Sequence, residues 1–147
     1  MTTIAYAAGV LAADTQLSGD TVDRTHKLAR LPDGSLVGCA GDAWRCRALI
    51  EWLSAGQKGR RPALSQVDAQ IVREDGVWQV DRAWPPIPVD EPTAIGSGAL
   101  GAMVAMRLGC DAVQAVEAVC GVDPMTSGPV EFLRYPQKPK AKIRKSR

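Results

Sequence analysis

A threonine stands directly behind the initiator methionine, in the sequence Met1-Thr2-Thr3-Ile4. Removal of Met1 would leave Thr2 with a hydroxyl and a free α-amine on one residue. Such a threonine is a nucleophile that carries its own base, and it needs no separate histidine. Most chains that begin Met-Thr do no chemistry with this residue, so the dipeptide indicates catalysis only together with other residues of the right types.

Asp14 and Lys27 are of the right types to tune such a nucleophile. Asp14 closes the second of two short apolar runs, and Lys27 begins an alternating segment. A nearby ammonium lowers the pKa of a hydroxyl or an amine, and a buried carboxylate holds that ammonium in place. The simpler interpretation is that Asp14 is a turn residue and that Lys27 is a solvated side chain.

The site would also need an N–H for the oxyanion and hydroxyls near the amine. Three short segments of small residues could supply them: residues 40–41, 96–98 and 126–128. Gly41 lies at a predicted switch from strand to helix, where a backbone N–H without a neighbouring side chain can stabilise an oxyanion. Ser97 and Thr126 could relay a proton or hold the amine. Alternatively, Gly41 is only a backbone hinge, and Ser97 is the N-cap of a helix.

Short strands and three helices must position these residues. Apolar or alternating runs predict strands at 3–8, 10–13, 27–31, 35–40, 67–73, 77–81, 93–95 and 130–133. Apolar positions at helical spacing predict helices at 43–54, 99–108 and 112–120. Residues 15–25 are polar and predict a loop, and the proline-rich residues 83–92 predict extended chain, with Trp84 against the body. Strands and helices that come in blocks indicate antiparallel sheets with helices outside them.

The composition is that of a globular protein with an uneven charge distribution. The chain has 147 residues, of which 46% are hydrophobic and 23% are charged, so we expect one domain at 1–135. Residues 134–147 hold seven Lys or Arg and no acid, whereas residues 1–133 hold 11 Lys or Arg and 16 Asp or Glu. Residues 136–147 predict a basic, disordered tail.

Several classes of protein are disfavoured. No apolar run reaches membrane-spanning length, and no basic leader precedes the first one, so we expect a cytoplasmic protein. The four cysteines form no CxxC pair and His26 is the single histidine, so we expect no metal site, no cofactor and no disulfide framework. The single histidine also argues against a hydrolase that uses a histidine base.

Taken in chain order, these segments resemble the proteasome β-subunit family, and most closely its bacterial HslV-type branch. The matching segments are 2–4, 9–16, 19–22, 27–28, 38–43, 94–98 and 123–130. The resemblance spans residues 2–133 and implies the fold of the N-terminal-nucleophile (Ntn) hydrolases. That fold is of the α+β class, a four-layer αββα sandwich of two antiparallel sheets flanked by helices.

The resemblance also implies a role for each matching residue. Thr2 matches the catalytic nucleophile, and Asp14 and Lys27 match the charged pair that tunes it. The other matches are Gly41 for the oxyanion-hole amide, Ser97 near the free amine, and Asp123 and Thr126 for a supporting polar pair. The residues that border the primary specificity pocket match Thr25, Ala29, Cys39 and Ala43, whose small side chains favour a small or medium apolar substrate side chain.

One departure from the family concerns the segment after Gly41. The family has two consecutive helices there, whereas a single helix is predicted here, ending near Gly56. In the family, these helices help to stack rings and meet an unfoldase. The resemblance therefore implies a homo-oligomer, with a ring as one form, and the missing helix argues against a standard ATP-dependent unfoldase as partner.

The leading hypothesis is a threonine-type peptidase that cleaves polypeptides with Thr2 once Met1 has been removed. Two alternatives stay open. The first is a non-catalytic module of the same fold, which contacts nucleic acid or an acidic partner through the basic tail. Nucleic acid is disfavoured because no aromatic residues for base stacking are interleaved with the basic residues of the tail. The second is an amidase that acts on a small substrate.

Overall fold

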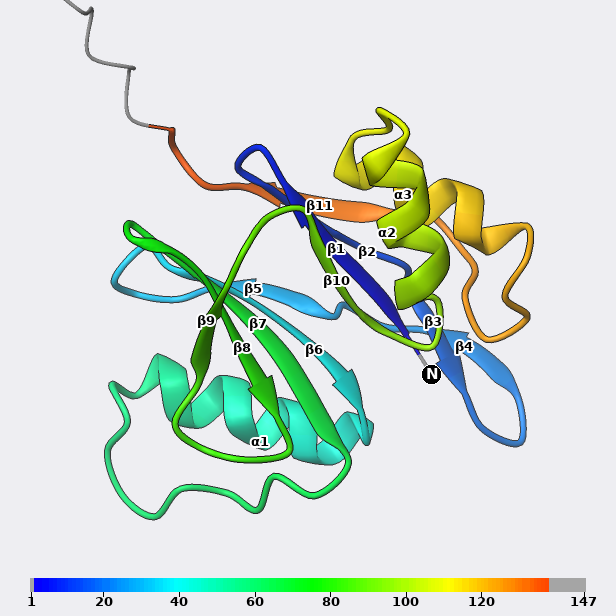
Figure 1. Ribbon diagram of the computed structural model, residues 1–147. Helices are drawn as coiled ribbons and strands as arrows, with labels where there is room; N and C mark the ends of the chain where they lie inside the picture. The colour runs from blue at the N-terminus through cyan, green and yellow to red at the C-terminus, as the bar shows by residue number, and fades with distance from the viewer. Residues whose placement is uncertain (1, 138–147) are drawn as a thin grey trace, which may run out of the picture.

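The computed structural model describes residues 2–137, which form two stacked antiparallel sheets between helices (Figure 1). Sheet 1 has the strand order β10-β1-β2-β11. Its strands are β1 (Thr3–Ala7), β2 (Val10–Ala13), β10 (Thr93–Gly96) and β11 (Glu131–Arg134). Residues Ala8 and Gly9 turn the chain between β1 and β2, both with positive φ. The first strand therefore lies in the middle of its sheet, between β10 and β2.

Sheet 2 has the strand order β5-β6-β7-β8-β9. Its strands are β5 (Leu28–Arg30), β6 (Leu36–Gly41), β7 (Val67–Arg73), β8 (Gly76–Asp81) and β9 (Ile87–Val89). The hairpin of β5 and β6 turns at Asp33, whose side chain accepts a hydrogen bond from the Ser35 N–H at 2.9 Å. The second hairpin of this sheet is formed by β7 and β8. The turn residues predicted both hairpins.

Helices cover the outer faces of both sheets. Helix α1 (Ala43–Ser54) covers sheet 2, and α2 (Ala99–Arg107) and α3 (Ala112–Cys120) cover sheet 1 (Figure 1). Asp42 caps α1 by accepting a hydrogen bond from the Arg45 N–H, and Asp111 forms a capping box with Gln114 at α3. These layers are those of the predicted αββα sandwich, and only one helix covers sheet 2 in the described residues, as expected.

Three apolar clusters hold the four layers together. Between the sheets, Ile4, Tyr6 and Leu11 meet Leu36 and Val72. On the other face of sheet 2, alternate residues such as Val37 and Cys39 pack against Leu49 and Leu53 of α1. On the outer face of sheet 1 the residues are smaller, with Ala5 and Ala12 packing against Ala102, Ala112, Ala115 and Val116. The alternation along each strand therefore assigns each side chain to one cluster.

The prediction of a loop at residues 15–25 was wrong. The chain forms a two-stranded ribbon there, in which β3 (Gln16–Ser18) pairs with β4 (Val22–Arg24). Its polar side chains give little of the alternation that marks a half-buried strand, and β4 is exposed along its length. Trp84 does pack against the body, with its ring centroid 5.1 Å from that of Trp52.

Two other predictions concern the C-terminal tail and membrane-spanning segments. The predicted tail, residues 136–147, lies outside the described residues except for Pro136 and Gln137. Across residues 2–137, the helices are too short or too polar to cross a membrane.

Candidate active site

Thr2 lies just before β1, and its main chain is fixed by the β10–α2 junction. The Ser97 N–H donates to the Thr2 carbonyl oxygen at 2.8 Å. Gly96 has a φ of +96°, and a Cβ on this residue would overlap the Thr2 carbonyl oxygen. Only glycine allows this close approach together with this backbone conformation. Ser97 is therefore held next to Thr2, which is itself 6% exposed.

Asp14 lies at the end of β2 with a side chain that is fully buried. Its Oδ1 accepts from the Thr3 N–H at 3.0 Å and lies 2.9 Å from Lys27 Nζ. Its Oδ2 accepts from the N–H groups of Gln16 at 3.2 Å and Ser127 at 3.3 Å. A buried carboxylate with this number of donors is well satisfied. Asp14 thus joins the start of β1, the Lys27 ammonium and the loop after α3.

The Lys27 side chain is only 6% exposed and forms the buried ion pair with Asp14. Burial lowers the pKa of Lys27, and the hydrogen bond and charge of Asp14, followed by the charge of Glu131, oppose that effect without cancelling it. An ammonium next to the Thr2–Thr3 peptide is the arrangement that facilitates deprotonation of a nearby hydroxyl. The predicted pairing of Asp14 with Lys27 is present in the structure.

A chain of hydroxyl and carboxylate groups connects β1 with the loop after α3. Thr3 Oγ1 lies 2.7 Å from Thr126 Oγ1, and Thr126 Oγ1 donates to Asp123 Oδ2 at 2.7 Å. Ser97 Oγ donates to the same oxygen at 2.6 Å. Burial is the largest single influence and raises the pKa of Asp123, but the hydrogen bonds from Ser97, the Met125 N–H and Thr126 together bring it below its ordinary value. Asp123 is therefore a carboxylate with an exposed neighbour, Ser97, beside Thr2.

Gly41 ends β6 with a φ of +117°, and a Cβ there would overlap the Gln66 carbonyl oxygen. The Cys39 N–H donates to the Lys27 carbonyl on the β5 side, and the Asp42 N–H donates to Gln66 on the β7 side. Because N–H groups alternate along a strand, the Gly41 N–H points to the β5 side, beyond the start of β5. Gly41 thus lies just before the N-terminus of α1. It is two residues along β6 from Cys39, whose N–H donates to the Lys27 carbonyl.

The four residues matched to a specificity pocket lie around β5, β6 and the start of α1. Thr25 and Ala29 are half-buried, Ala43 is exposed, and Cys39 is buried. The Cys39 thiol meets the thiol of Cys46 in α1, and this hydrogen bond, followed by burial, raises the pKa of Cys39. The charge of Lys27 also acts on Cys46. Thr25 and Ala29 flank Lys27 in the sequence, and the Cys39 N–H donates to its carbonyl. Contact of the four residues with a substrate stays a prediction.

The sequence did not point to the side chains of Thr3 and Glu131 as parts of this network. Thr3 was noted only as part of the N-terminal segment, yet its hydroxyl bonds Thr126, 123 residues along the chain. Glu131 reaches His26, Lys27 and Leu28 from β11. Nothing local to either residue marks these long-range contacts, so no sequence signal could have found them.

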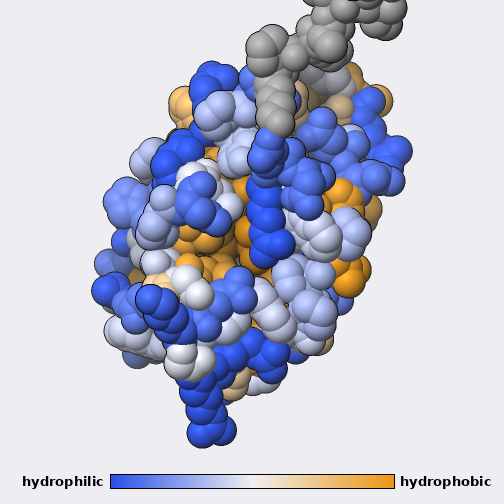
Figure 2. Space-filling view, turned by 90° about the vertical axis from the view of Figure 1, so that its left-hand side faces the viewer, coloured by the Kyte–Doolittle hydropathy of each residue, from blue (hydrophilic) through white to orange (hydrophobic). Residues whose placement is uncertain are grey.

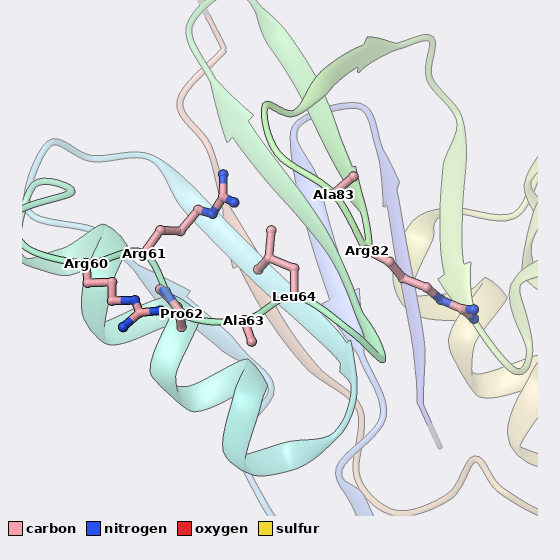
Figure 3. Close-up of a pocket in the computed structure, with 7 residues that line it drawn as sticks. All are labelled: Arg60, Arg61, Pro62, Ala63, Leu64, Arg82 and Ala83. Carbon is pink, nitrogen blue, oxygen red and sulfur yellow. The ribbon is translucent and has the colours of Figure 1, made fainter.

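Two hollows lie outside the centre of this network. The smaller, of about 260 Å³, is lined by Ser97, Asp123 and residues of α2 and α3, and it borders the network on its helical side. The larger, of about 700 Å³, is lined by Arg60, Arg61, Pro62, Ala63, Leu64, Arg82 and Ala83, none of which belongs to the network (Figure 3). On the face drawn in Figure 2, hydrophilic groups predominate, and hydrophobic surface shows in a central hollow.

Comparison with known proteins identified similarity only at the level of structure. A scan against protein-family models found no match, and a search of curated proteins found none either. Thiobacillus denitrificans BPH in complex with epoxomicin is similar with a TM-score of 0.68 and 19% identity, over 92% of this chain and 99% of that chain. A second BPH structure gives a TM-score of 0.65 and 18% identity over 93% and 99% of the two chains.

Eukaryotic HslV from Trypanosoma brucei is similar with a TM-score of 0.66 and 20% identity, over 90% of this chain and 98% of that chain. At these identities the likeness concerns the fold. It agrees with the element order, the two stacked sheets and the helical layers described above. The chain therefore has the proteasome β-type fold of the HslV-like peptidases.

Proposed function

We propose that this chain is a threonine-type peptidase, with Thr2 as its nucleophile after removal of Met1. The observation that carries the proposal is the polar network beside Thr2, which is buried at Thr3, Asp14, Lys27 and Thr126 and opens to the surface at Ser97. It joins Lys27 to Asp14 and joins Asp123 to Ser97 and Thr126, with Thr3 between the two groups. Buried polar groups that satisfy one another at the end of two central strands are costly to assemble for stability alone, which supports a catalytic use.

The proposed reaction begins when Thr2 Oγ1 attacks the carbonyl carbon of the scissile bond. The free α-amine of Thr2 takes the hydroxyl proton and passes it to the leaving amine as the C–N bond breaks. The Gly41 N–H stabilises the oxyanion, assisted by the N-terminus of α1. A water molecule, deprotonated by the same amine, then attacks the carbonyl carbon of the Thr2 ester. The ester C–O bond breaks, the amine returns the proton to Thr2 Oγ1, and the acid is released.

The other residues hold and tune the reacting groups in this proposal. Lys27, kept by Asp14, favours the deprotonated Thr2 hydroxyl. Asp123 and Ser97 accept and orient the α-amine, because Asp123 stays ionised under its hydrogen bonds. The complex of the structurally similar BPH with epoxomicin supports testing that ligand here. The preferred substrate is a polypeptide with a small or medium apolar residue directly before the cleaved bond.

The proposal is tested first by intact mass. We expect the purified protein to lack Met1 and to gain the mass of one epoxomicin on Thr2. The Thr2→Ala variant should keep its circular dichroism spectrum and lose peptide cleavage by at least about 10³-fold. Ser54→Ala, which removes an exposed hydroxyl at the end of α1, is the matched control and should keep full activity. Retention of Met1, or no adduct on Thr2, would refute the proposal.

A small amide is the alternative substrate class for the same site. A panel of fluorogenic peptides beside simple amides separates the two, because a peptidase gains in kcat/KM from substrate residues on both sides of the bond. Assembly into a homo-oligomer in the cytoplasm is part of the proposal, since the HslV-like fold suggests it. Light scattering measures the assembled mass, and cleavage without ATP tests whether an unfoldase is needed.

A second candidate function is a binding module for an acidic protein segment. It is favoured by the hollow whose lining includes Arg60 and Arg61, from the loop after α1, and Arg82, which directly follows β8 (Figure 3). The lining contains no acidic residue, and its net positive charge favours an anionic ligand. A polyglutamate peptide should then bind in a salt-dependent way, and Arg60→Gln/Arg61→Gln should abolish binding without changing peptide cleavage. No binding at low salt would exclude this function.

A further inference from the structure

Glu131 connects the two sheets at the point where Lys27 enters the site. It is the first residue of β11 in sheet 1, and its side chain is 20% exposed. Its Oε1 accepts from the backbone N–H of Lys27 at 2.5 Å and from that of Leu28 at 3.0 Å. Its Oε2 lies 2.8 Å from Nδ1 of His26. One carboxylate thus binds three consecutive residues at the start of β5, in the other sheet.

The segment held by Glu131 leads into the edge strand of a sheet. β5 is the edge strand of sheet 2 and spans only Leu28–Arg30. On its inner side, the Lys27 carbonyl accepts from the Cys39 N–H at 3.2 Å. On the other side, an edge strand presents N–H groups that no further strand takes up. Glu131 supplies the acceptor for this edge.

The position of Glu131 is set by sheet 1 and not by the segment that it holds. Glu131 pairs with Ala13 in the register of β11 and β2. Ala13 directly precedes Asp14, whose Oδ1 receives Lys27 Nζ at 2.9 Å. The two carboxylates that act on Lys27 therefore come from one sheet, Glu131 from β11 and Asp14 from the residue directly after the neighbouring β2. One holds the main chain of Lys27 and the other holds its side chain.

We propose that Glu131 is a positioning residue for Lys27: its carboxylate fixes the backbone that carries Lys27, and its negative charge supports the Lys27 ammonium next to Asp14. This inference rests on the proposed function, in which Lys27 activates Thr2. The charged and titratable groups around Lys27 are Asp14, Glu131, Cys46 and, on the outer oxygen of Glu131, His26. Glu131 touches no reacting atom in this assignment.

Two substitutions separate the two parts of this role. Glu131→Gln keeps an oxygen that can accept from both N–H groups and removes the charge, whereas Glu131→Ala removes both. We expect Glu131→Ala to lower kcat by about 10- to 100-fold with KM changed less than about twofold, as for outer residues that orient a reacting group. We expect Glu131→Gln to lower kcat by less than about fivefold. His26→Ala leaves both N–H bonds in place and is the matched control, with kcat within about twofold of the wild type.

A nuclear magnetic resonance titration of Lys27 gives a readout that a merely structural role would not move. The Lys27 ¹³Cε signal should titrate at a lower pH in Glu131→Gln than in the wild type, because the supporting charge is lost. It should stay at the wild-type pH in His26→Ala, because this variant keeps the Glu131 carboxylate. Wild-type kcat in Glu131→Ala, or an unchanged Lys27 titration in Glu131→Gln, would overturn the proposal.

The titration is carried out in the Thr2→Ala background as well, so that the two proposals can fail separately. If the chain takes no epoxomicin and cleaves no peptide, the proposed function fails, while the shift of the Lys27 titration still decides the role of Glu131. If Glu131→Ala does not fold, Glu131→Gln decides the question alone, because it keeps the acceptor and changes only the charge.

Discussion

The β6–α1 and β10–α2 junctions are built on one backbone pattern but use their polar residues differently. Each strand ends in a glycine of positive φ, Gly41 or Gly96, whose Cβ would overlap a neighbouring carbonyl oxygen. In each case the next N–H donates to that same oxygen, from Asp42 to Gln66 at 2.9 Å and from Ser97 to Thr2 at 2.8 Å. Two short turns thus close on the adjacent strand in the same way.

The side chains at these junctions differ in where they are directed. Asp42 caps its own helix by accepting from the Arg45 N–H. Helix α2 has Gly98 as its N-cap and no side-chain cap, and Ser97 Oγ instead donates to Asp123, 26 residues away. A serine before a helix is ordinarily its N-cap. The polar residue at one junction therefore stabilises a helix, while the polar residue at the other is available to a site.

The same contrast holds for the ion pairs of the two regions. The Arg47–Glu51 pair on α1 is a one-turn pair, with side chains that are 74% and 67% exposed. The Lys27–Asp14 pair bridges two sheets and is buried. Local polar pairs on an exposed helix face contribute little, whereas a buried pair is indispensable once its groups have left water. Substitutions on both sides test how far the contrast extends.

The largest difference is expected between the two ion pairs. Lys27→Met should lower the free energy of unfolding by about 3–5 kcal/mol, because the buried Asp14 carboxylate loses its counter-ion. Arg47→Met, on the exposed pair, should lower it by less than about 0.5 kcal/mol. Urea denaturation of both variants measures the difference. Equal losses would show that the two pairs are energetically alike and would break the comparison.

The next largest effect is expected at the junction glycines. Gly96→Ala and Gly41→Ala should each cost about 3 kcal/mol or more, because a positive φ and a collision with a carbonyl oxygen act together. Gly56→Ala is the control, since Gly56 also has a positive φ of 73° but has open space around its Cβ position. It should cost about 1–2 kcal/mol. Thermal unfolding that ranks Gly56→Ala with the other two would contradict the close contacts.

Smaller effects are expected for the polar residues after the glycines. One substitution should mainly lower stability, and the other should mainly slow catalysis. Asp42→Ala should lower stability by about 1 kcal/mol through loss of the cap. Ser97→Ala should change it by less than about 0.5 kcal/mol and yet slow peptide cleavage by at least about tenfold. Thermal unfolding and kcat/KM are measured for both variants. A stability loss at Ser97 as large as that at Asp42 would mean that Ser97 is structural.

The smallest effect is expected in the way that Tm falls at acid pH. The pKa of Asp123 is lowered in the folded chain, so its ionised form contributes stability that is fully present above the ordinary carboxyl pKa. This contribution is lost as the pH falls through the lowered folded-state pKa. The Tm of the wild type should therefore fall more steeply below about pH 4 than that of Asp123→Asn. If the curves of Tm against pH run parallel for the two proteins, the three hydrogen bonds to Asp123 do not stabilise its ionised form.

Much of the fold could be predicted from local signals. The Pro32-Asp33-Gly34 turn, the Asp42 and Asp111 caps and the alternation of residues 27–31 predicted their elements within a few residues. The β3–β4 ribbon could not be predicted, because its side chains are polar and β4 is exposed. A strand of this kind is defined by its partner and not by its own pattern.

The candidate site was predictable only in part, and for a related physical reason. The resemblance selected Asp14 and Lys27, and the structure pairs them. The local pattern at Ser97 favoured a helix cap, which the structure does not use. Glu131 carries no local signal, since the residues that it holds are more than 100 positions away. Contacts of such separation are decided by tertiary structure alone.

The hydrogen bond between Thr3 and Thr126 spans 123 residues, and this separation has a consequence during synthesis. The ribosome delivers the amino terminus first, and the Asp123–Thr126 segment emerges only after all of sheet 2, α2 and α3. A nascent or prematurely terminated chain therefore presents Thr2 without its polar surroundings. Completion of the chain itself becomes the condition under which the amino-terminal threonine acquires its neighbours.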